Sequence, residues 1–352
     1  MYGFKISLNQ VKIPLKSGVL GWAGGGNFVA KSKYIGRLFI ALKPLEVIDI
    51  LQDDAFRQKK KRVVISCADE ITEVINQFSD ELIDNYYLPG VQKQGGMLSL
   101  MNKLTMKKMG EEAGLKSPGI YKIDDEDIEF PVITKPAISS HGSKGEIKLF
   151  ENSEELQKYI SVVQDEVFVQ QYVKKKEEVQ FIGCSLRGGE EIIIPGMTRI
   201  LRSQHNTNTG FLEYGPVDTF YQSTIESCKH FLRNCGYSGL FSMEFLRDIN
   251  DKIYFLETNF RNDGNAWCVT ASGVNLPLIW VLANKSLDYH KEAVKIPRNI
   301  VVMPEFQDFK LVLQRKVGLF QWLKDLMKTD AFLDYNKKDP KPFWCFIFEK
   351  LL

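Results

Sequence analysis

The stretch YFLETNFRNDGN, from Tyr254 to Asn265, carries polar side chains at alternate positions along its length. Because side chains alternate between the two faces of a strand, Phe255, Glu257, Asn259 and Arg261 are expected on one face. The other face is mostly apolar and suited to burial; it consists of Tyr254, Leu256, Thr258 and Phe260. The pattern therefore predicts a half-buried strand that presents a carboxylate, an amide and a guanidinium in a row.

The residues before this strand predict its hairpin partner. The sequence FSMEFLRDINDK ends in turn-forming residues, so Ile249–Lys252 is expected to form the loop between two strands. In the resulting register, Leu246 faces Phe255 and Glu244 faces Glu257. Directly opposed like charges destabilise a sheet, which raises the question of what relieves the glutamate pair.

A divalent cation would relieve the repulsion between the two glutamates. Glu244, Glu257 and Asn259 offer oxygen ligands, which suit magnesium, and magnesium commonly binds together with the phosphates of a nucleotide. Arg261 lies next on the same face and can bind a phosphate oxygen or a charged intermediate with its planar guanidinium. The alternative is a surface hairpin in which a glutamate and the arginine form a solvated salt bridge.

The composition limits the class of protein. The chain has 352 residues, 44% of them hydrophobic, which favours a globular protein with two or three subdomains. Its 46 basic and 44 acidic residues leave a net charge of +2, so no nucleic-acid partner is expected. We find no signal peptide, membrane-length apolar run, C-x-x-C pair or disulfide framework, so a cytoplasmic location is expected. The cysteines are scattered; they are Cys67, Cys184, Cys228, Cys235, Cys268 and Cys345.

Hydrophobic patterning predicts the α/β fold class. A compact apolar run at Arg62–Ala68 predicts a strand, and the spacing of apolar residues in Asp69–Tyr87 predicts a helix after it. A further helix is expected over residues 98–114. From Phe130 onward the sequence changes to apolar strands separated by glycine-rich turns.

Two glycine-containing loops are candidates for binding phosphate. The first, GGNFVAKS at Gly25–Ser32, is close to a P-loop but has Ala30 where the pattern requires glycine, and a poor strand precedes it. A P-loop NTPase would depend on Lys31 and Ser32. The alternative is an ordinary turn, which could line a substrate site.

The second loop, SSHGSKG, lies within Phe130–Phe150 between two strand-like runs, and Lys135 closes the first of them. Small residues let the backbone approach a triphosphate, and Lys135 and Lys144 can neutralise its charge; the alternative is an ordinary turn. Downstream, the apolar strand Val167–Val173 could hold an adenine through backbone hydrogen bonds, although a core strand also explains it.

Taken in this order, the segments from about Asn102 to Asn265 resemble an ATP-grasp enzyme. NKLTMKKMGEEAGLKSPG is similar to the helix whose first lysine reaches the phosphates, FPVITKPAISSHGSKG to the lysine strand and phosphate lid, and FVQQYV to the adenine hinge. ETNFR, from Glu257 to Arg261, matches the E-x-N-x-R pattern of the family, with Glu244 as the other acidic metal ligand.

The resemblance implies a role for each of these residues. The phosphates would be bound by Lys103, Lys135, Ser140, Gly142, Ser143 and Lys144, and the adenine by Gln170, Gln171, Tyr172 and Val173. Glu178 would bind the ribose, with Glu177 as the alternative. Magnesium, or manganese in its place, would be held by Glu244, Glu257 and Asn259. Arg261 and Lys135 would be the catalytic residues.

The resemblance also implies an N-terminal pre-ATP-grasp α/β domain followed by a two-lobed α+β ATP-grasp module. The expected boundaries are 1–100 for the N-terminal domain, 101–173 for the small lobe with the lid, 174–300 for the large lobe with the metal site, and 301–352 for a C-terminal extension. KRVVISCADEITEVINQFSDEL followed by YLPG is similar to this region of carbamoyl-phosphate-synthase-like and D-aspartate-ligase-like carboxylate–amine ligases.

The implied activity is that of an ATP- and magnesium-dependent ligase. A substrate carboxylate would attack the γ-phosphate to give an acyl phosphate and ADP, and an amine would then displace phosphate to form an amide. Amino acids and cell-wall or glycan precursors are the expected substrates. Arg199, Arg202 and His205 are candidates to bind an acidic one, the alternative being surface residues beside a loop. A non-catalytic nucleotide-binding protein is the alternative function.

Small-molecule acids and amines are the expected partners, and a homodimer is compatible with the sequence. The final segment, DPKPFWCFIFEKLL at Asp339–Leu352, gathers bulky apolar side chains without a pronounced basic face. We expect it to pack against the body of the protein or a partner subunit rather than lie on a membrane.

Overall fold

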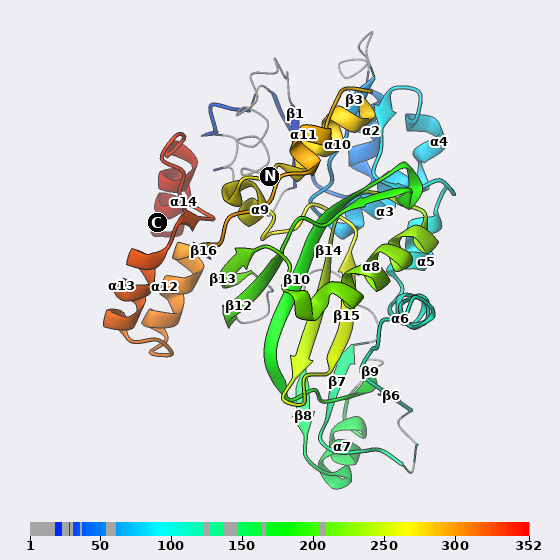
Figure 1. The fold of residues 1–352 in the computed structure, drawn as a ribbon, viewed down its shortest axis with the longest axis vertical. Helices are drawn as coiled ribbons and strands as arrows, with labels where there is room; N and C mark the ends of the chain where they lie inside the picture. The colour runs from blue at the N-terminus through cyan, green and yellow to red at the C-terminus, as the bar shows by residue number, and fades with distance from the viewer. Residues whose placement is uncertain are drawn as a thin grey trace.

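The computed structural model describes residues 18–22, 28, 31–35, 37–53, 61–122, 125, 127–136, 147–163, 167–203 and 209–351. The chain forms an N-terminal unit, a small lobe, a large lobe built on one long sheet, and a helical C-terminal region (Figure 1). Helices pack against parallel, antiparallel and mixed sheets along the described chain, so the predicted α/β class is confirmed.

The N-terminal unit packs short parallel strand pairs against helices. β1 (Gly18–Trp22) pairs with β2 (Arg37–Ala41), and β3 (Arg62–Val63) pairs with β4 (Tyr86–Tyr87). The helices are α2 (Glu46–Gln52), α3 (Asp69–Gln77) and α4 (Ser79–Leu82), and they share one apolar core. β5 (Gly90–Val91) pairs with a strand of the large sheet, so backbone hydrogen bonds join this unit to the large lobe.

The first glycine-containing loop has no helix directly after it. Residues 31–35 form a turn and β2 begins at Arg37, whereas a P-loop leads into a helix. Ser32 is buried, and its hydroxyl donates a 2.6 Å hydrogen bond to the carboxylate of Asp339. The P-loop alternative is therefore wrong, and Ser32 anchors the end of the chain instead.

The helix expected over residues 98–114 is interrupted. α5 (Gly96–Met101) ends before Asn102, whose backbone is extended and whose side chain accepts hydrogen bonds from the N–H groups of Leu104 and Thr105. Asn102 thereby caps α6 (Lys103–Glu112), because the first turn of a helix leaves N–H groups without partners. The break makes Lys103 the first residue of a helix.

The small lobe is a sheet of order β6-β9-β7-β8 in the described chain. Its elements are β6 (Ile120–Tyr121), β7 (Val132–Pro136), β8 (Lys148–Phe150), α7 (Ser153–Ile160) and β9 (Val167–Gln171). Leu156 of α7 is buried against Val132, Phe150 and Val169. The apolar runs around the second glycine-containing loop therefore form strands, as predicted.

The large sheet runs in the order β15-β14-β10-β12-β13-β16-β17, and β11 pairs with β10. Its strands are β10 (Lys175–Leu186), β11 (Glu191–Ile193), β12 (Met197–Ser203), β13 (Gly210–Gly215), β14 (Tyr237–Asp248), β15 (Ile253–Asn259), β16 (Ile300–Met303) and β17 (Ala331–Phe332).

Helices cover different parts of this sheet. α8 (Gln222–Cys235) lies on one face, over a core that includes Phe181, Phe245 and Phe255. α9 (Trp267–Ser272) and α10 (Leu276–Asn284), followed by α11 (His290–Ala293), pack over a second core. The long strands β10, β14 and β15 extend from these helices toward the small lobe (Figure 1).

The C-terminal region consists of α12 (Glu305–Leu313), α13 (Leu319–Lys328) and α14 (Lys341–Leu351). Phe346 of α14 packs against Phe306 of α12, with ring centroids 4.8 Å apart, and against Phe28 at 4.9 Å. These contacts confirm the expectation that the final segment packs against the body of the protein.

The β14–β15 hairpin confirms one part of the predicted register and corrects another. Glu244 lies opposite Glu257 as expected, but Phe255 lies opposite Phe245 rather than its expected partner. A β-bulge leaves Leu256 without an opposite residue, so the alternation of side chains changes phase there. Phe255 is therefore buried in the core under α8 and does not share the face of Glu257.

Candidate active site

The polar face expected on β15 is present beyond the bulge. Glu244 and Glu257 face each other, and Ser242 faces Asn259 two residues along the same strands. The side-chain amide of Asn259 donates hydrogen bonds to the Glu244 carboxylate at 2.8 Å and to the Ser242 hydroxyl at 3.3 Å. Glu244 and Asn259 are buried and Glu257 is half-buried. The hairpin thus gathers two carboxylates and an amide in one patch.

This donor set fits magnesium that binds together with phosphates. Among the described residues, no group of three or more His, Cys, Asp and Glu side chains is placed to hold a metal by itself. Magnesium keeps several of its waters and usually takes one or two carboxylates plus phosphate oxygens. Glu244 and Glu257 supply two carboxylates in direct opposition, and a cation between them would offset their repulsion.

Arg261 lies just beyond β15 and is held by three side chains. Its guanidinium donates hydrogen bonds to Asp69 at 2.8 Å, to Asp263 at 3.2 Å and to the side-chain oxygen of Asn259 at 3.3 Å. Burial disfavours the charge, but the carboxylates of Asp69 and Asp263 outweigh it and raise the pKa of Arg261 above its usual value. The guanidinium is therefore charged and fixed in orientation beside the two glutamates.

Asp69 brings the N-terminal unit into this site, and the sequence analysis missed it. It is the first residue of α3, where the helix dipole favours a carboxylate. Burial raises the pKa of Asp69, although Arg261 opposes the shift. Thr72, one turn later, donates a 2.9 Å hydrogen bond to the carbonyl of Phe260. These two contacts fix the start of α3 against the segment that carries Arg261.

Two consecutive glutamates in β10 point to opposite faces of the large sheet. Gln180 lies opposite Glu244 in the β10–β14 ladder, so Glu178, two residues before it, shares the face of Glu244. The Glu178 carboxylate accepts a 2.9 Å hydrogen bond from Lys175. Glu177 points to the other face, toward α8.

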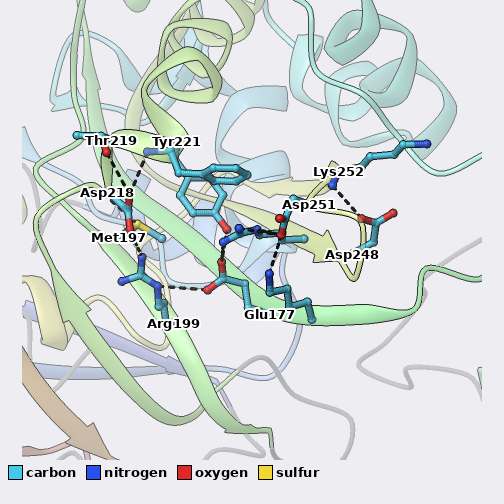
Figure 2. A network of polar contacts seen from close by, with 12 residues as sticks. Glu177, Met197, Arg199, Asp218, Thr219, Tyr221, Asp248, Asp251 and Lys252 are labelled. Atoms are coloured by element: carbon cyan, nitrogen blue, oxygen red, sulfur yellow. Dashed lines mark hydrogen bonds and ion pairs between the residues drawn. The ribbon is translucent and has the colours of Figure 1, made fainter.

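Glu177 is enclosed by a polar network of its own (Figure 2). Its carboxylate accepts hydrogen bonds from Tyr221 at 2.7 Å, Arg247 at 2.8 Å and Arg199 at 3.2 Å. Burial disfavours its charge, but the bonds from Tyr221 and Arg247 outweigh it, so the pKa of Glu177 is lowered. Arg199 also donates to Asp218 at 2.8 Å. We call these five side chains the far-face network.

Both arginines predicted to bind substrate have acidic partners within the protein. Arg199 belongs to the far-face network, on the side of the sheet away from Glu244. Arg202 donates to Asp308 at 2.6 and 3.0 Å and to Asp325 at 2.8 Å, which ties β12 to α12 and α13. These contacts give both arginines structural roles and do not support direct contact with a substrate at the hairpin. The third candidate, His205, lies outside the described residues.

The predicted hinge joins the two lobes, and part of its backbone is occupied. The Gln171 N–H donates to the carbonyl of Gly119 at 2.8 Å, and the Gln171 side chain accepts the Gly119 N–H at 3.2 Å. The Tyr172 N–H donates to the carbonyl of Pro131 at 3.1 Å. These bonds fix the hinge to the small lobe, so neither of the two donors remains for an adenine.

Gln170 and Val173 are the other two hinge positions. Both are buried, Gln170 within β9 and Val173 just after it. Among the described residues, no group accepts a hydrogen bond from the Val173 N–H. Val173 therefore keeps a backbone donor at the junction of the lobes.

Two predicted phosphate-binding lysines come from neighbouring elements. The ammonium of Lys103, at the start of α6, lies 5.8 Å from the centre of the Phe168 ring. Phe168 in turn lies opposite Lys135 in the β7–β9 ladder. The start of α6 therefore lies beside the strand that carries Lys135. The predicted lid residues lie outside the described part of the chain; they are Ser140, Gly142, Ser143 and Lys144.

Gln180 is a second residue that the sequence analysis missed. It is buried opposite Glu244, and its side-chain oxygen accepts a 3.1 Å hydrogen bond from Asn265. The side-chain nitrogen of Gln180 is also buried and has no hydrogen-bond partner within the described residues. Buried polar groups nearly always have a partner, so this donor beside Glu244 is a candidate to bind a ligand. No motif marked it, because a glutamine within an apolar strand has no pattern of its own.

Comparison with known proteins agrees with this geometry. Residues 101–283 match the family model for the ATP-binding domain of the carbamoyl-phosphate synthase large chain, which is more than half of the chain. The chain belongs to the ATP-grasp family. The ATP-grasp assignment makes the protein an ATP-binding enzyme of the ligase class. No curated protein matches the sequence.

Solved ATP-grasp structures share the fold across most of the chain. N5-carboxyaminoimidazole synthetase from Staphylococcus aureus is 17% identical, with 89% of this chain and 82% of that chain covered and a TM-score of 0.66. L-amino acid ligase from Bacillus licheniformis is 16% identical, with 85% and 73% covered and a TM-score of 0.59. The biotin carboxylase domain of 2-oxoglutarate carboxylase from Hydrogenobacter thermophilus, in complex with MgADP and bicarbonate, is 14% identical, with 85% and 70% covered and a TM-score of 0.61.

Proposed function

We propose that this ATP-grasp protein joins a carboxylate to an amine through an acyl phosphate and releases ADP and phosphate. The observation that carries the proposal is the opposition of Glu244 and Glu257 on a hairpin that also presents Asn259 and Arg261. Two opposed carboxylates beside a fixed guanidinium suit a magnesium-bound triphosphate and the acyl phosphate made from it.

The nucleotide would bind between the two lobes. Lys103 and Lys135 would contact its phosphates, and the Val173 N–H would donate to the adenine. Glu178 is the better candidate for the ribose, since Glu177 is enclosed on the other face of the sheet. Gln170, Gln171 and Tyr172 would contact the adenine through groups other than the two N–H donors already bound within the small lobe. The four lid residues keep the phosphate-binding role that the family resemblance implies.

In the first step, an oxygen of the substrate carboxylate attacks the γ-phosphorus, the bond to the bridging oxygen breaks, and ADP leaves. Magnesium, when bound by Glu244 and Glu257, would neutralise charge on the phosphates. Arg261 would hold the acyl phosphate, and its bond to Asp69 would fix its orientation. The amine then attacks the acyl carbon, phosphate leaves, and the nitrogen loses a proton to give the amide. The work of the chain is to position groups and to stabilise charge.

The substrate class is the finer part of the proposal. Amino acids and cell-wall or glycan precursors remain the classes that we favour, and the fold shared with an L-amino acid ligase supports the first. The bicarbonate bound in the 2-oxoglutarate carboxylase domain makes bicarbonate a further acid to test.

The test measures ADP release from ATP and magnesium in the presence of each candidate acid, alone and with amines, and identifies the product by mass spectrometry. We expect ADP release that depends on one class of acid and is lost in Arg261→Ala. The matched control Arg199→Ala should retain it, because Arg199 lies on the other face of the sheet. ATP binding with no ADP formed from any acid would contradict the ligase assignment and support a non-catalytic nucleotide-binding protein.

A further inference from the structure

Helix α13 packs against the protein partly through Asp325 and Trp322, and it presents a set of large apolar side chains to solvent. On the inner face, Asp325 is bound to Arg202, and the Trp322 ring packs against Phe309 with centroids 5.0 Å apart. On the outer face, Phe320 is 82% exposed and Met327 is 79% exposed. This arrangement is the reverse of an ordinary surface helix, which buries its apolar stripe.

The exposed residues form one continuous stripe, which we call the α13 stripe. At 100° per residue, Leu319, Phe320, Leu323 and Met327 fall within an arc of roughly 100°. All four are exposed. Such a stripe on a monomer marks a surface that contacts another body.

The charges around the α13 stripe are sorted by sign. Within residues 305–328, every basic side chain is exposed; these are Lys310, Arg315, Lys316, Lys324 and Lys328. The three acids of the same segment have partners inside the protein: Asp308 and Asp325 bind Arg202, and Glu305 accepts the N–H groups of Asp334 and Tyr335. The surface around the stripe is therefore positive, and its complement is an anionic surface with an apolar layer.

We propose that the α13 stripe docks on the surface of an anionic lipid bilayer. A bilayer supplies an apolar layer for the stripe and anionic headgroups for Lys324 and Lys328, which lie on one flank of α13. A second copy of the same face suits it less well, because a two-fold contact would bring the basic residues of both copies together. No helix in the described chain has the length and apolar character of a membrane span, so the contact is peripheral.

The α13 stripe is separate from the final segment, Asp339–Leu352, which was expected not to lie on a membrane. The final segment is tied to the body by Phe346 and Asp339, as expected for a packed tail. α13 lies at the edge of the molecule, beyond α12 and away from the lobes that bind nucleotide (Figure 1). Docking through the α13 stripe would therefore leave the active site open to soluble substrates.

The test is cosedimentation of the full-length protein with vesicles of phosphatidylcholine alone or mixed with phosphatidylserine, at low and high salt. We expect the protein to pellet with the mixed vesicles at low salt and to be released by high salt, which screens the lysines. The double variant Phe320→Glu/Met327→Glu should lower the bound fraction at least about tenfold, since it removes two inserted side chains and adds two negative charges.

The matched control is Val162→Glu/Leu287→Glu, which makes the same change at side chains that are 73% and 53% exposed elsewhere on the molecule. It should bind the mixed vesicles like the unaltered protein. Circular dichroism and thermal melting check that both variants fold, which is expected because all four side chains face solvent. No binding to mixed vesicles, equal binding to neutral vesicles, or equal loss in the control overturns the proposal. Concentration-dependent dimers that Phe320→Glu/Met327→Glu abolishes would also overturn it and assign the stripe to a second copy of the chain.

Discussion

The two faces of the large sheet carry similar side chains and arrange them in opposite ways. On the α8 face, Glu177 sits among two arginines and a tyrosine, so each charge has a partner within the protein. On the hairpin face, Glu244 stands opposite Glu257, and Arg261, just beyond β15, is bound to two aspartates and an asparagine. Figure 2 shows the far-face network together with neighbouring residues such as Asp251, which also binds Arg247.

The difference separates a structural cluster from a candidate active site. Opposite charges that satisfy one another need nothing from outside, and their removal costs stability. Like charges in direct opposition are unfavourable by themselves, and they persist where a ligand or metal offsets the repulsion. The comparison therefore predicts that equal changes on the two faces affect different properties of the protein.

Glu257→Gln should give the largest effect. A neutral amide cannot replace an anionic magnesium ligand, so we expect magnesium-dependent ADP formation to fall by about a thousandfold while the fold is kept. The stability of the variant should be equal or higher, because the repulsion from Glu244 is removed. The measurement is the rate of ADP release across a magnesium titration, with urea unfolding of the same samples. Activity close to that of the unaltered protein would remove Glu257 from the metal site.

Glu177→Ala makes the matching change on the α8 face. It leaves Arg247, Arg199 and the Tyr221 hydroxyl without their shared acceptor, so we expect the free energy of unfolding to fall by about 2 kcal/mol at neutral pH. The rate of ADP release per folded molecule should be unchanged. Urea unfolding followed by circular dichroism measures the first quantity, and steady-state kinetics the second.

The pH dependence of that stability follows from the lowered pKa of Glu177. A carboxyl whose pKa is lower in the folded state stabilises the protein above its unfolded pKa, and this contribution is lost as pH falls through the folded pKa. The difference in free energy of unfolding between Glu177→Ala and the unaltered protein should therefore be at its maximum at pH 7 and become smaller below about pH 4. A difference that stays constant down to acid pH would mean that packing, and not charge, is what Glu177 contributes.

Much of the fold and the centre of the site could be predicted from the sequence. Short apolar runs mark β7, β9 and the second half of β10, and Glu257, Asn259 and Arg261 lie close together in the chain, so a local pattern reveals them. The bulge at Leu256 could not be predicted, because the register on either side of it is equally compatible with apolar packing.

Contacts between residues that lie far apart in the chain could not be predicted from the sequence. Asp69 and Arg261 are 192 positions apart, and no spacing rule connects them. For Arg199 and Arg202, the sequence shows the charge but not the face or the partner, which only the pairing of β12 with its neighbours fixes. Gln180 could be recognised as a site residue only from two structural observations. The strand ladder places it opposite Glu244, and its side-chain nitrogen is buried without a hydrogen-bond partner among the described residues.

Asp69→Asn sharpens the comparison at Arg261, whose guanidinium lies on the Glu244 side of the hairpin and is bound to Asp69 and Asp263. The amide still accepts a hydrogen bond but loses the charge that holds Arg261, so we expect kcat for ADP release to fall about tenfold through misplacement of the guanidinium. The KM for ATP should change little. Glu70→Gln is the matched control, because Glu70 is the next residue and is exposed. Equal effects in the two variants would mean that Asp69 contributes only negative charge near the site and does not position Arg261.

A second pair of neighbouring acids, Glu305 and Asp334, tests whether close carboxylates alone define a metal site. Here backbone N–H groups act as partners: Glu305 accepts from Asp334 and Tyr335, and Asp334 accepts from Phe306. Burial, with the nearby Asp334 charge, raises the pKa of Glu305 to about 7. The folded protein therefore keeps a proton on Glu305 at pH values where the unfolded chain, with its ordinary pKa of 4.5, has released it. The stability that this proton provides is lost as pH rises from about 4.5 to about 7.

Glu305→Gln should remove the loss of stability that the unaltered protein shows as pH rises. The amide is uncharged, like the protonated acid, but its single oxygen can keep only one of the two backbone hydrogen bonds. We therefore expect the stability of the variant relative to the unaltered protein to be about 1–2 kcal/mol higher at pH 8 than below about pH 4.5. Thermal or urea unfolding between pH 4 and pH 8 measures the difference. Magnesium should alter neither curve, since the backbone already supplies the partners that the carboxylates need. A stabilisation by magnesium at pH 8 that disappears in Glu305→Gln would make this pair a second cation site, and opposition of Glu244 and Glu257 would then no longer distinguish the hairpin.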